Sequence, residues 1–310
     1  MLPTIPFMRW YKPAAVFSVL LLIGCIGLLA VKGLKYGLDF TGGTQIGVLY
    51  EQAPSLDDVR QNLTDNGYPN HEVVNIGSDR EVLIRIQNAE GEGNSDSGET
   101  AVHVVDILRE NSGMEVTLQS SEFVGSQVGD ELKEQGGLGM LLALAMIMIY
   151  IAVRFQFKFA VGAVASLAHD VVLTLGFFSL IGLTFDLTVL AALLAVIGYS
   201  LNDTIVVADR IRENFRILRG TEPAEVIDIA VTQTLVRTTI TSVTTLLVLT
   251  SLYMFGGQVV EGFALALIFG VAVGTYSSIY VASSALLFLD VTKEDLMPPA
   301  REKDELDAIP

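Results

Sequence analysis

Asp203 lies inside an otherwise apolar run, residues 190–208, that is long enough to cross a bilayer. A carboxylate at the centre of a membrane helix costs about 2.5–3.5 kcal/mol on insertion scales, so something must offset that cost. The next apolar run along the chain carries Arg237. Opposite charges in two consecutive apolar runs indicate a membrane protein that handles ions or protons.

The pair Asp203 and Arg237 predicts a specific chemistry. Burial favours the protonated form of a carboxyl group, whereas a nearby guanidinium favours the carboxylate. If Arg237 moves away, Asp203 takes up a proton, and the proton leaves when Arg237 returns. Such a site converts a proton gradient into helix motion. The alternative is a structural ion pair that joins two helices, although desolvation makes buried pairs weak stabilisers.

Further polar residues lie in the same apolar segments. Asp170, next to His169, falls near the middle of the third run and is a candidate second member of a proton relay. Its alternative role is a polar contact that packs the helices. Asn202 and Thr204 flank Asp203, where they either orient the carboxylate or water, or form ordinary hydrogen bonds between helices.

Two stripes predict how the last two apolar helices face their neighbours. Arg237 shares a helix face with Thr241 and with Gln233, Thr234 and Thr244, and we expect this polar face to point into the bundle. The last run has small residues at four-residue steps, which permit close helix approach. They include Gly270, Gly274 and Ser278.

Composition narrows the class of protein. The 310 residues are 51% hydrophobic and only 17% charged, where soluble domains contain about a quarter charged residues. The formal net charge of −16 argues against a nucleic-acid partner, which needs a basic surface. Cys25 is the only cysteine, so no intrachain disulfide forms. Neither a metal-ligand cluster nor a nucleophile–base pair is visible, and we expect no metal site, no cofactor and no enzymatic activity.

Six runs approach the roughly 20 apolar residues that a spanning helix needs. They are Ala14–Val31, Leu138–Val153, Ala160–Ile181, Thr188–Val207, Leu235–Phe255 and Phe263–Leu289. Lys and Arg gather before the first run, between the second and third, and between the fourth and fifth. This alternation predicts cytoplasmic N- and C-termini. The expected organisation is a cytoplasmic N-terminus (1–13), a first membrane helix (14–31), a periplasmic domain (32–135), five further membrane helices (136–289) and an acidic cytoplasmic tail (290–310).

The segment between the first two spans predicts a small α+β domain. Strands are expected at 44–50, 71–76, 81–87 and 114–120, and helices from Ser55 to about Asn66 and over 99–111. Residues 89–98 are rich in Gly, Ser, Glu and Asp and predict a flexible loop. The order β-α-β-β-α-β is that of a ferredoxin-like sandwich.

Five motifs in this order carry a family resemblance. They are GLDFTGGT (37–44), VGSQVG (124–129), AHD (168–170), GYSLNDTIVVADRIREN (198–214) and TQTLVRTTITSVTT (232–245). On these motifs the chain resembles the SecF subunits of the SecD/SecF family, which belongs to the resistance-nodulation-division (RND) superfamily. The resemblance implies an RND-type half bundle of six membrane helices in the bacterial inner membrane, with a ferredoxin-like periplasmic domain.

The resemblance also implies a role and partners. It implies a heterodimer with SecD that uses the proton-motive force to drive preproteins across the cytoplasmic membrane. The wider complex would include the SecYEG channel, the SecA motor and YajC. In that family, the residues at positions 203 and 237 would belong to the proton pathway.

Two other functions stay open from the sequence. One is half of an RND-type exporter of small molecules or lipids, but the outward segment is short and the loop between the fifth and sixth spans is only a turn. The other is a non-transporting scaffold of the translocon. Asp203 and Arg237 argue against a scaffold, which has little use for costly intramembrane charges.

Overall fold

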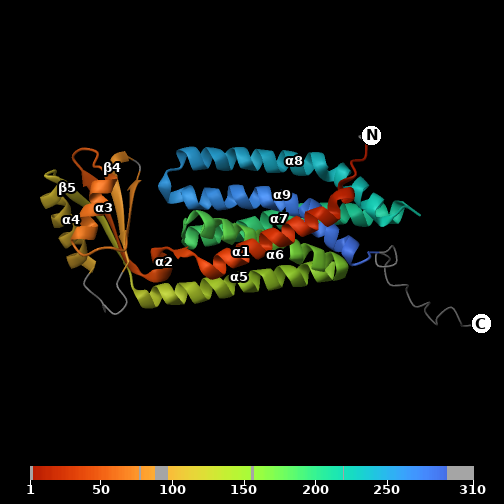
Figure 1. Ribbon diagram of the computed structural model, residues 1–310, viewed down its shortest axis with the longest axis horizontal. Coiled ribbons are helices and arrows are strands. Elements are labelled where there is room, and N and C mark those ends of the chain that lie inside the picture. The colour runs from red at the N-terminus through yellow and green to blue at the C-terminus, as the bar shows by residue number, and fades with distance from the viewer. Residues whose placement is uncertain (1–2, 77, 88–96, 155–156, 219, 292–310) are drawn as a thin grey trace, which may run out of the picture.

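The fold is an elongated helical bundle with a small α/β domain at one end (Figure 1). The computed structural model describes residues 3–76, 78–87, 97–154, 157–218 and 220–291. Within them, six helices are long and apolar enough to span a membrane. They are α1 (Tyr11–Val31), α5 (Ser126–Arg154), α6 (Phe157–Ile181), α7 (Leu187–Ile217), α8 (Pro223–Phe255) and α9 (Glu261–Phe288). The expected six-span membrane architecture is confirmed.

The α/β domain has the expected ferredoxin-like arrangement. Its elements are β2 (Gly43–Tyr50), α3 (Leu56–Asp65), β3 (His71–Ile76), β4 (Ser78–Ile86), α4 (Ser97–Ser112) and β5 (Val116–Val124). The four strands pair antiparallel in the order β3-β4-β2-β5. One face of the sheet packs on α3 and α4 through residues such as Ile46, Ile84, Leu63 and Leu108. The predicted flexible loop lies mostly outside the described residues.

Strand β5 and helix α5 extend well beyond the bounds that the sequence predicts. Strand β5 continues to Val124, where it pairs with Gly43, because the whole length of β2 is available as a partner. Helix α5 begins at Ser126 rather than near residue 138. Its polar first turns pack against the short helix α2 (Leu38–Thr41), where Gly129 lies against the backbone of Phe40. This packing extends the helix beyond its apolar run.

Helix α9 occupies the centre of the bundle, where it packs against α6, α7 and α8. Helices α1 and α5 lie on the periphery and leave most of their apolar surface exposed, as expected of lipid-facing helices. The small residues of α9 permit this central position. A Cβ atom on Gly270 would lie 2.2 Å from Cγ2 of Val196 on α7, so the α9 backbone packs directly against that side chain.

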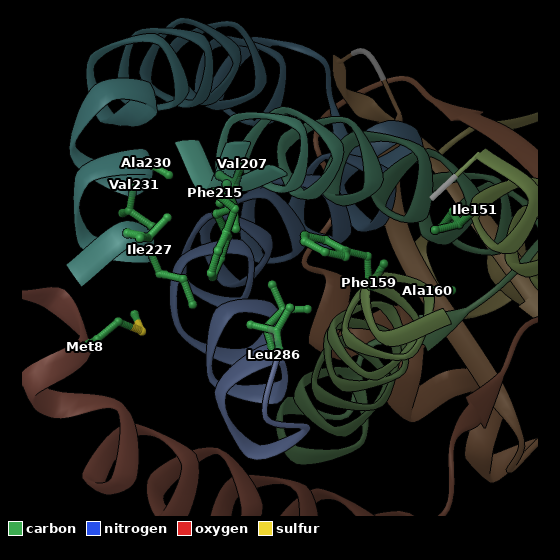
Figure 2. Packing of buried hydrophobic residues seen from close by; sticks show 14 residues of the cluster. Met8, Ile151, Phe159, Ala160, Val207, Phe215, Ile227, Ala230, Val231 and Leu286 are labelled. Carbon is green, nitrogen blue, oxygen red and sulfur yellow. The ribbon is translucent and has the colours of Figure 1, made fainter. Parts of the chain in front are cut away.

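A cluster of buried apolar side chains closes the end of the bundle remote from the α/β domain, here called the distal end (Figure 2). It joins the chain before α1 to the ends of α7 and α9 and the start of α8, through Met8, Phe215, Ile227 and Leu286. The short helix η1 (Phe7–Trp10) is fixed there because the Met8 N–H donates to Oδ1 of Asp228, 2.7 Å away. The first and last described segments therefore lie at the same end.

The opposite end joins the bundle to the α/β domain. Strand β1 (Lys35–Tyr36), directly after α1, pairs parallel with β6 (Thr184–Phe185), which lies between α6 and α7. The short helix η2 (Gln258–Val260), between α8 and α9, contacts β3. The start of α7 is thus built into the base of the domain.

Candidate functional site

Asp203 lies on the inner face of α7. It is 3% exposed and shares that face with Ser200, Thr204 and Val207, which are also buried. Its Oδ2 atom has no hydrogen-bond partner within the described part of the chain, and neither does the Thr204 hydroxyl. An unpaired buried acceptor is costly, so this carboxyl group is suited to binding a proton or a polar group that approaches it.

Arg237 faces away from the interior of this chain. It lines a groove of about 470 Å³ between α5, α7 and α8, together with Tyr150, Ile205 and Gln233. The expectation that the Arg237 face points into the bundle is wrong for the isolated chain. Of that predicted face only Thr234 is buried, and α8 also buries Thr238, Ser242 and the apolar residues near its start.

Asp203 and Arg237 do not form a direct ion pair among the described residues, contrary to the structural-pair alternative. They still interact electrostatically across the space between α7 and α8. A separated pair of this kind fits a site in which the distance between the two charges changes during a cycle. Tyr199 and Ser242 link the same two helices, with 3.3 Å between the hydroxyl oxygens.

The flanking polar residues have different environments. Asn202 is exposed, about 100° around α7 from the buried Asp203, and no hydrogen bond joins it to the carboxylate among the described residues. The Thr241 hydroxyl donates to backbone carbonyls of its own helix, at Arg237 (3.1 Å) and Thr238 (2.9 Å). Of the three polar residues Asn202, Thr204 and Thr241, Thr204 is the one that shares the buried face of Asp203.

Asp170 lies in a second buried polar cluster. Its Oδ2 accepts hydrogen bonds from Ser200 on α7 and Ser277 on α9, the latter at 2.7 Å. Its Oδ1 lies 3.0 Å from Nδ1 of His169. Because Ser200 precedes Asp203 by three residues on α7, the two acidic sites are one helical turn apart along that helix.

The small residues of α9 give this second cluster its space. A Cβ atom on Gly274 would lie 3.1 Å from Cβ of Ser200 and 3.6 Å from Oδ2 of Asp170. The Ser278 hydroxyl instead donates to the Thr275 carbonyl of its own helix at 3.1 Å. Gly270 and Gly274 thus face α7, and among the described residues no hydrogen bond joins Ser278 to Asp170.

Several residues of the site were not foreseen from the sequence. The sequence does not indicate that Ser200 and Ser277 would donate to Asp170. Gln233 accepts hydrogen bonds from Arg210 (2.6 Å) and Asn214 (3.0 Å). These bonds join α7 to α8 on the distal side of Asp203. The excess of polar residues in the segment 198–214 is the only sequence signal for this link.

Glu72 connects the α/β domain to the bundle. Its carboxylate accepts a hydrogen bond from Thr184 on β6 (3.0 Å) and lies 3.5 Å from Lys35 and 3.3 Å from Arg85. Burial raises the pKa of Glu72, but Lys35, the Thr184 hydroxyl and Arg85 together outweigh burial and hold the pKa below its usual value.

Comparison with known proteins identifies the family. Residues 103–292 match the model of the protein export membrane protein SecD/SecF C-terminal region, and residues 27–54 match the SecD/SecF GG motif. The chain is 50% identical to protein translocase subunit SecF of Vibrio alginolyticus, over 99% of this chain and 97% of that protein. It is 47% identical to the SecF subunit of Pseudomonas aeruginosa, over 99% and 98% of the two chains.

A solved structure matches the fold as well. The crystal structure of SecDF, a translocon-associated membrane protein from Thermus thermophilus, superposes with a TM-score of 0.79 at 37% identity. The match covers 93% of this chain but only 39% of the SecDF chain. The long apolar helices, the ferredoxin-like domain and both family models agree, and the chain belongs to the SecD/SecF family of protein-export membrane proteins.

Proposed function

We propose that this chain works in protein export by coupling the proton-motive force to helix movement through Asp203 and Arg237. The observation that carries the proposal is the Asp203 carboxyl group, buried inside a membrane helix with one oxygen unpaired and with Arg237 acting on it from a distance. Protonation neutralises Asp203 and removes its attraction to Arg237, so proton binding and release would change how α7 and α8 pack.

A second protein is part of the proposal. A guanidinium exposed on a membrane helix is costly in lipid. We therefore expect a second protein to cover the groove that Arg237 lines. A SecD subunit is the proposed partner. In support, this chain corresponds to 39% of a single chain named SecDF, which leaves room there for a SecD-like remainder.

The wider setting follows from the same reasoning. We propose that SecYEG, SecA and YajC are further partners and that preproteins are the substrate, because the SecDF relative is titled translocon-associated. Arg9, Lys12, Lys158 and Arg210 all lie at or near the distal end, on segments that join the cluster of Figure 2. The concentration of basic residues there supports a cytoplasmic distal end, a periplasmic α/β domain and residence in the bacterial inner membrane.

The test uses inverted membrane vesicles that contain this chain with its SecD partner. Preprotein translocation is compared with and without a proton gradient for the parent, Asp203→Asn, Arg237→Ala and Arg237→Lys. We expect Asp203→Asn and Arg237→Ala to insert normally but to lose the gradient-dependent component, and Arg237→Lys to keep part of it because the charge remains.

The matched control is Glu225→Gln, which removes one negative charge from the exposed first turn of α8. This variant should translocate like the parent. Full gradient-dependent translocation by Asp203→Asn, at equal membrane abundance, contradicts the proposal and leaves the chain as a scaffold within the export machinery.

A further inference from the structure

His169 and Asp170 form a sealed pair at the junction of three helices. The His169 side chain is fully buried and that of Asp170 is 1% exposed. Helix α7 contributes the Ser200 hydroxyl and α9 the Ser277 hydroxyl, both of which donate to the same carboxylate oxygen, Oδ2. A third serine, Ser166 on α6, donates to Ser277 at 3.0 Å. The carboxyl group of Asp170 therefore holds α6, α7 and α9 together.

Charge balance requires a proton at this pair. Among the residues that the structure describes, His169 is the only ion-pair partner of Asp170. A neutral imidazole beside a carboxylate would leave one uncompensated negative charge in the membrane interior, which is strongly disfavoured. One added proton removes that charge, either as an imidazolium–carboxylate pair or as an imidazole beside a carboxylic acid.

One ring nitrogen of the pair has an unused hydrogen-bonding position. Nε2 of His169 is buried and has no hydrogen-bond partner within the described chain. The ring lies next to Tyr276 of α9, with 6.2 Å between ring centroids. The Tyr276 hydroxyl in turn lies 3.0 Å from Oγ of Ser18 on α1. Nε2 is thus the position at which a water or hydronium ion would deliver a proton.

No other charged group competes for this proton in the described surroundings. From α9 the titratable group that faces His169 is Tyr276, and from α7 the nearest acid is Asp203, one turn beyond Ser200. The contact of α1 with α6 includes Cys25 at Gly176, two turns from His169. The side chains of α5 that pack beside Leu167 and Val171 are apolar.

We propose that His169 and Asp170 form a second proton-binding site, which holds one shared proton and whose loading controls the contacts of α7 and α9 with α6. The inference rests on the proposed function for its link to export, since Ser200 connects the site to the turn of α7 that carries Asp203. When the shared proton lies on Oδ2, the carboxyl group becomes an O–H donor there, so its hydrogen bonds with Ser200 and Ser277 must rearrange and one serine then accepts from Oδ2 instead of donating to it. Because the pair is sealed in this arrangement of the helices, proton exchange at Nε2 requires a second arrangement in which water reaches that atom.

The first experiment counts protons on the parent chain, which avoids any folding problem. The chain has three histidines, so 15N labelling of histidine in lipid nanodiscs, with the SecD partner present, gives few signals to assign. Infrared difference spectra between the parent and Asp170→Asn report whether Asp170 is a carboxylic acid or a carboxylate. At pH 7 we expect either an imidazolium with a carboxylate or a neutral imidazole with a carboxylic acid. A neutral imidazole beside a carboxylate overturns the proposal.

The second experiment tests the link to the helices. Ser200→Ala and Ser277→Ala each remove a donor that favours the carboxylate, so the pair should keep its proton down to an about tenfold lower proton concentration. Ser278→Ala is the matched control, because its hydroxyl donates only to its own helix among the described contacts. Identical titrations for Ser277→Ala and Ser278→Ala contradict the link between proton loading and helix contacts.

The two proposals fail in distinguishable ways. In an Asp203→Asn chain, the His169–Asp170 pair should still hold its proton, although gradient-dependent export is lost. An Asp203→Asn chain that exports normally refutes the proposed function and leaves the proton count at His169 unaffected. A pair without a proton in the parent refutes the second site and leaves the role of Asp203 standing.

Discussion

Asp39 accepts a hydrogen bond from the backbone N–H of Leu187, with 3.0 Å between Oδ2 and the nitrogen. Asp39 belongs to α2, in the segment that matches the GG motif, and Leu187 is the first residue of α7. The bond connects the base of the α/β domain to the helix that carries Asp203. The first turn of α7 is therefore fixed to the base of the domain.

We predict that Asp39→Ala loosens the first turn of α7. Loss of a side-chain acceptor at a helix start costs about 0.5–2 kcal/mol. Hydrogen–deuterium exchange should therefore accelerate in the peptide that contains Leu187, while the middle of α7 stays protected. Glu110→Ala, on the exposed side of α4, is the control and should not change this peptide. Unchanged exchange in Asp39→Ala would show that Asp186, which caps Val189, is sufficient to hold the turn.

The contact between α7 and α9 predicts a strict size limit at Gly270. A methyl group there would overlap Val196, with 2.2 Å between Cβ and Cγ2, and such overpacking costs about 1–3 kcal/mol. Gly270→Ala should lower the thermal unfolding temperature in detergent. Adding Val196→Ala should restore part of it, because the smaller side chain makes room. Gly198→Ala on α7, where a Cβ meets no atom within 4 Å, serves as the control and should be neutral or slightly stabilising. Equal unfolding temperatures for the Gly270 and Gly198 variants would refute the close approach of Gly270 to Val196.

Glu72 predicts an acid-dependent junction between the α/β domain and the bundle. A carboxyl group with a lowered pKa stabilises the folded state above its unfolded pKa, about 4.3, and loses that contribution as the pH falls through the lower folded value. At pH 7 the free energy of unfolding of Glu72→Gln should therefore be lower than that of the parent. The difference should be at most about 1 kcal/mol, because the ion pairs are partly exposed. The difference should shrink below pH 4. A difference that is the same at both pH values would contradict this origin.

Tyr50 should make the α/β domain less stable as the pH rises into the alkaline range. Its side chain is 1% exposed in the core of the α/β domain, and its hydroxyl has no hydrogen-bond partner in the described chain. Burial raises the pKa of Tyr50 to about 12. The folded state keeps its proton where the unfolded chain, at about 10, releases it, so this group destabilises folding as the pH rises from about 10 to 12.

Tyr50→Phe should remove that alkaline component and should stabilise the domain by about 1 kcal/mol at pH 7, because an unpaired buried hydroxyl is lost. Chemical unfolding followed by circular dichroism at pH 7 and pH 11 checks both effects. A variant less stable than the parent at pH 7 would show that the hydroxyl has a partner in the native protein.

The α/β domain was predictable because its signals are local. Strands with alternating residues and the Ser55–Asp58 cap fix the element order, and the structure has that cap, with 3.4 Å between the Ser55 hydroxyl and the Asp58 nitrogen. The burial of Asp203 was also predictable from its own stretch of sequence, because a carboxylate in an apolar run must avoid lipid.

The facing of α8 was not predictable for a physical reason. Threonine hydroxyls in a helix can bond to carbonyls one turn back, as Thr241 and Thr244 do, so a threonine stripe need not seek the bundle interior. Both faces of α8 carry threonines, and tertiary packing selects Thr234 and Thr238. The role of Ser277 was not predictable either, because a serine among small residues on a helix is typical of packing until the register of α9 against α6 is known.

If Asp203 carries the protons that drive helix motion, removing its carboxyl group must abolish proton flow through the complex. The most direct measurement is proton uptake into liposomes that contain the chain with its SecD partner and an internal pH-sensitive dye, after an acid pulse outside. We predict that the parent and Glu225→Gln take up protons at the same rate and that Asp203→Asn falls to the rate of protein-free liposomes. Uptake by Asp203→Asn at the parental rate would contradict the account.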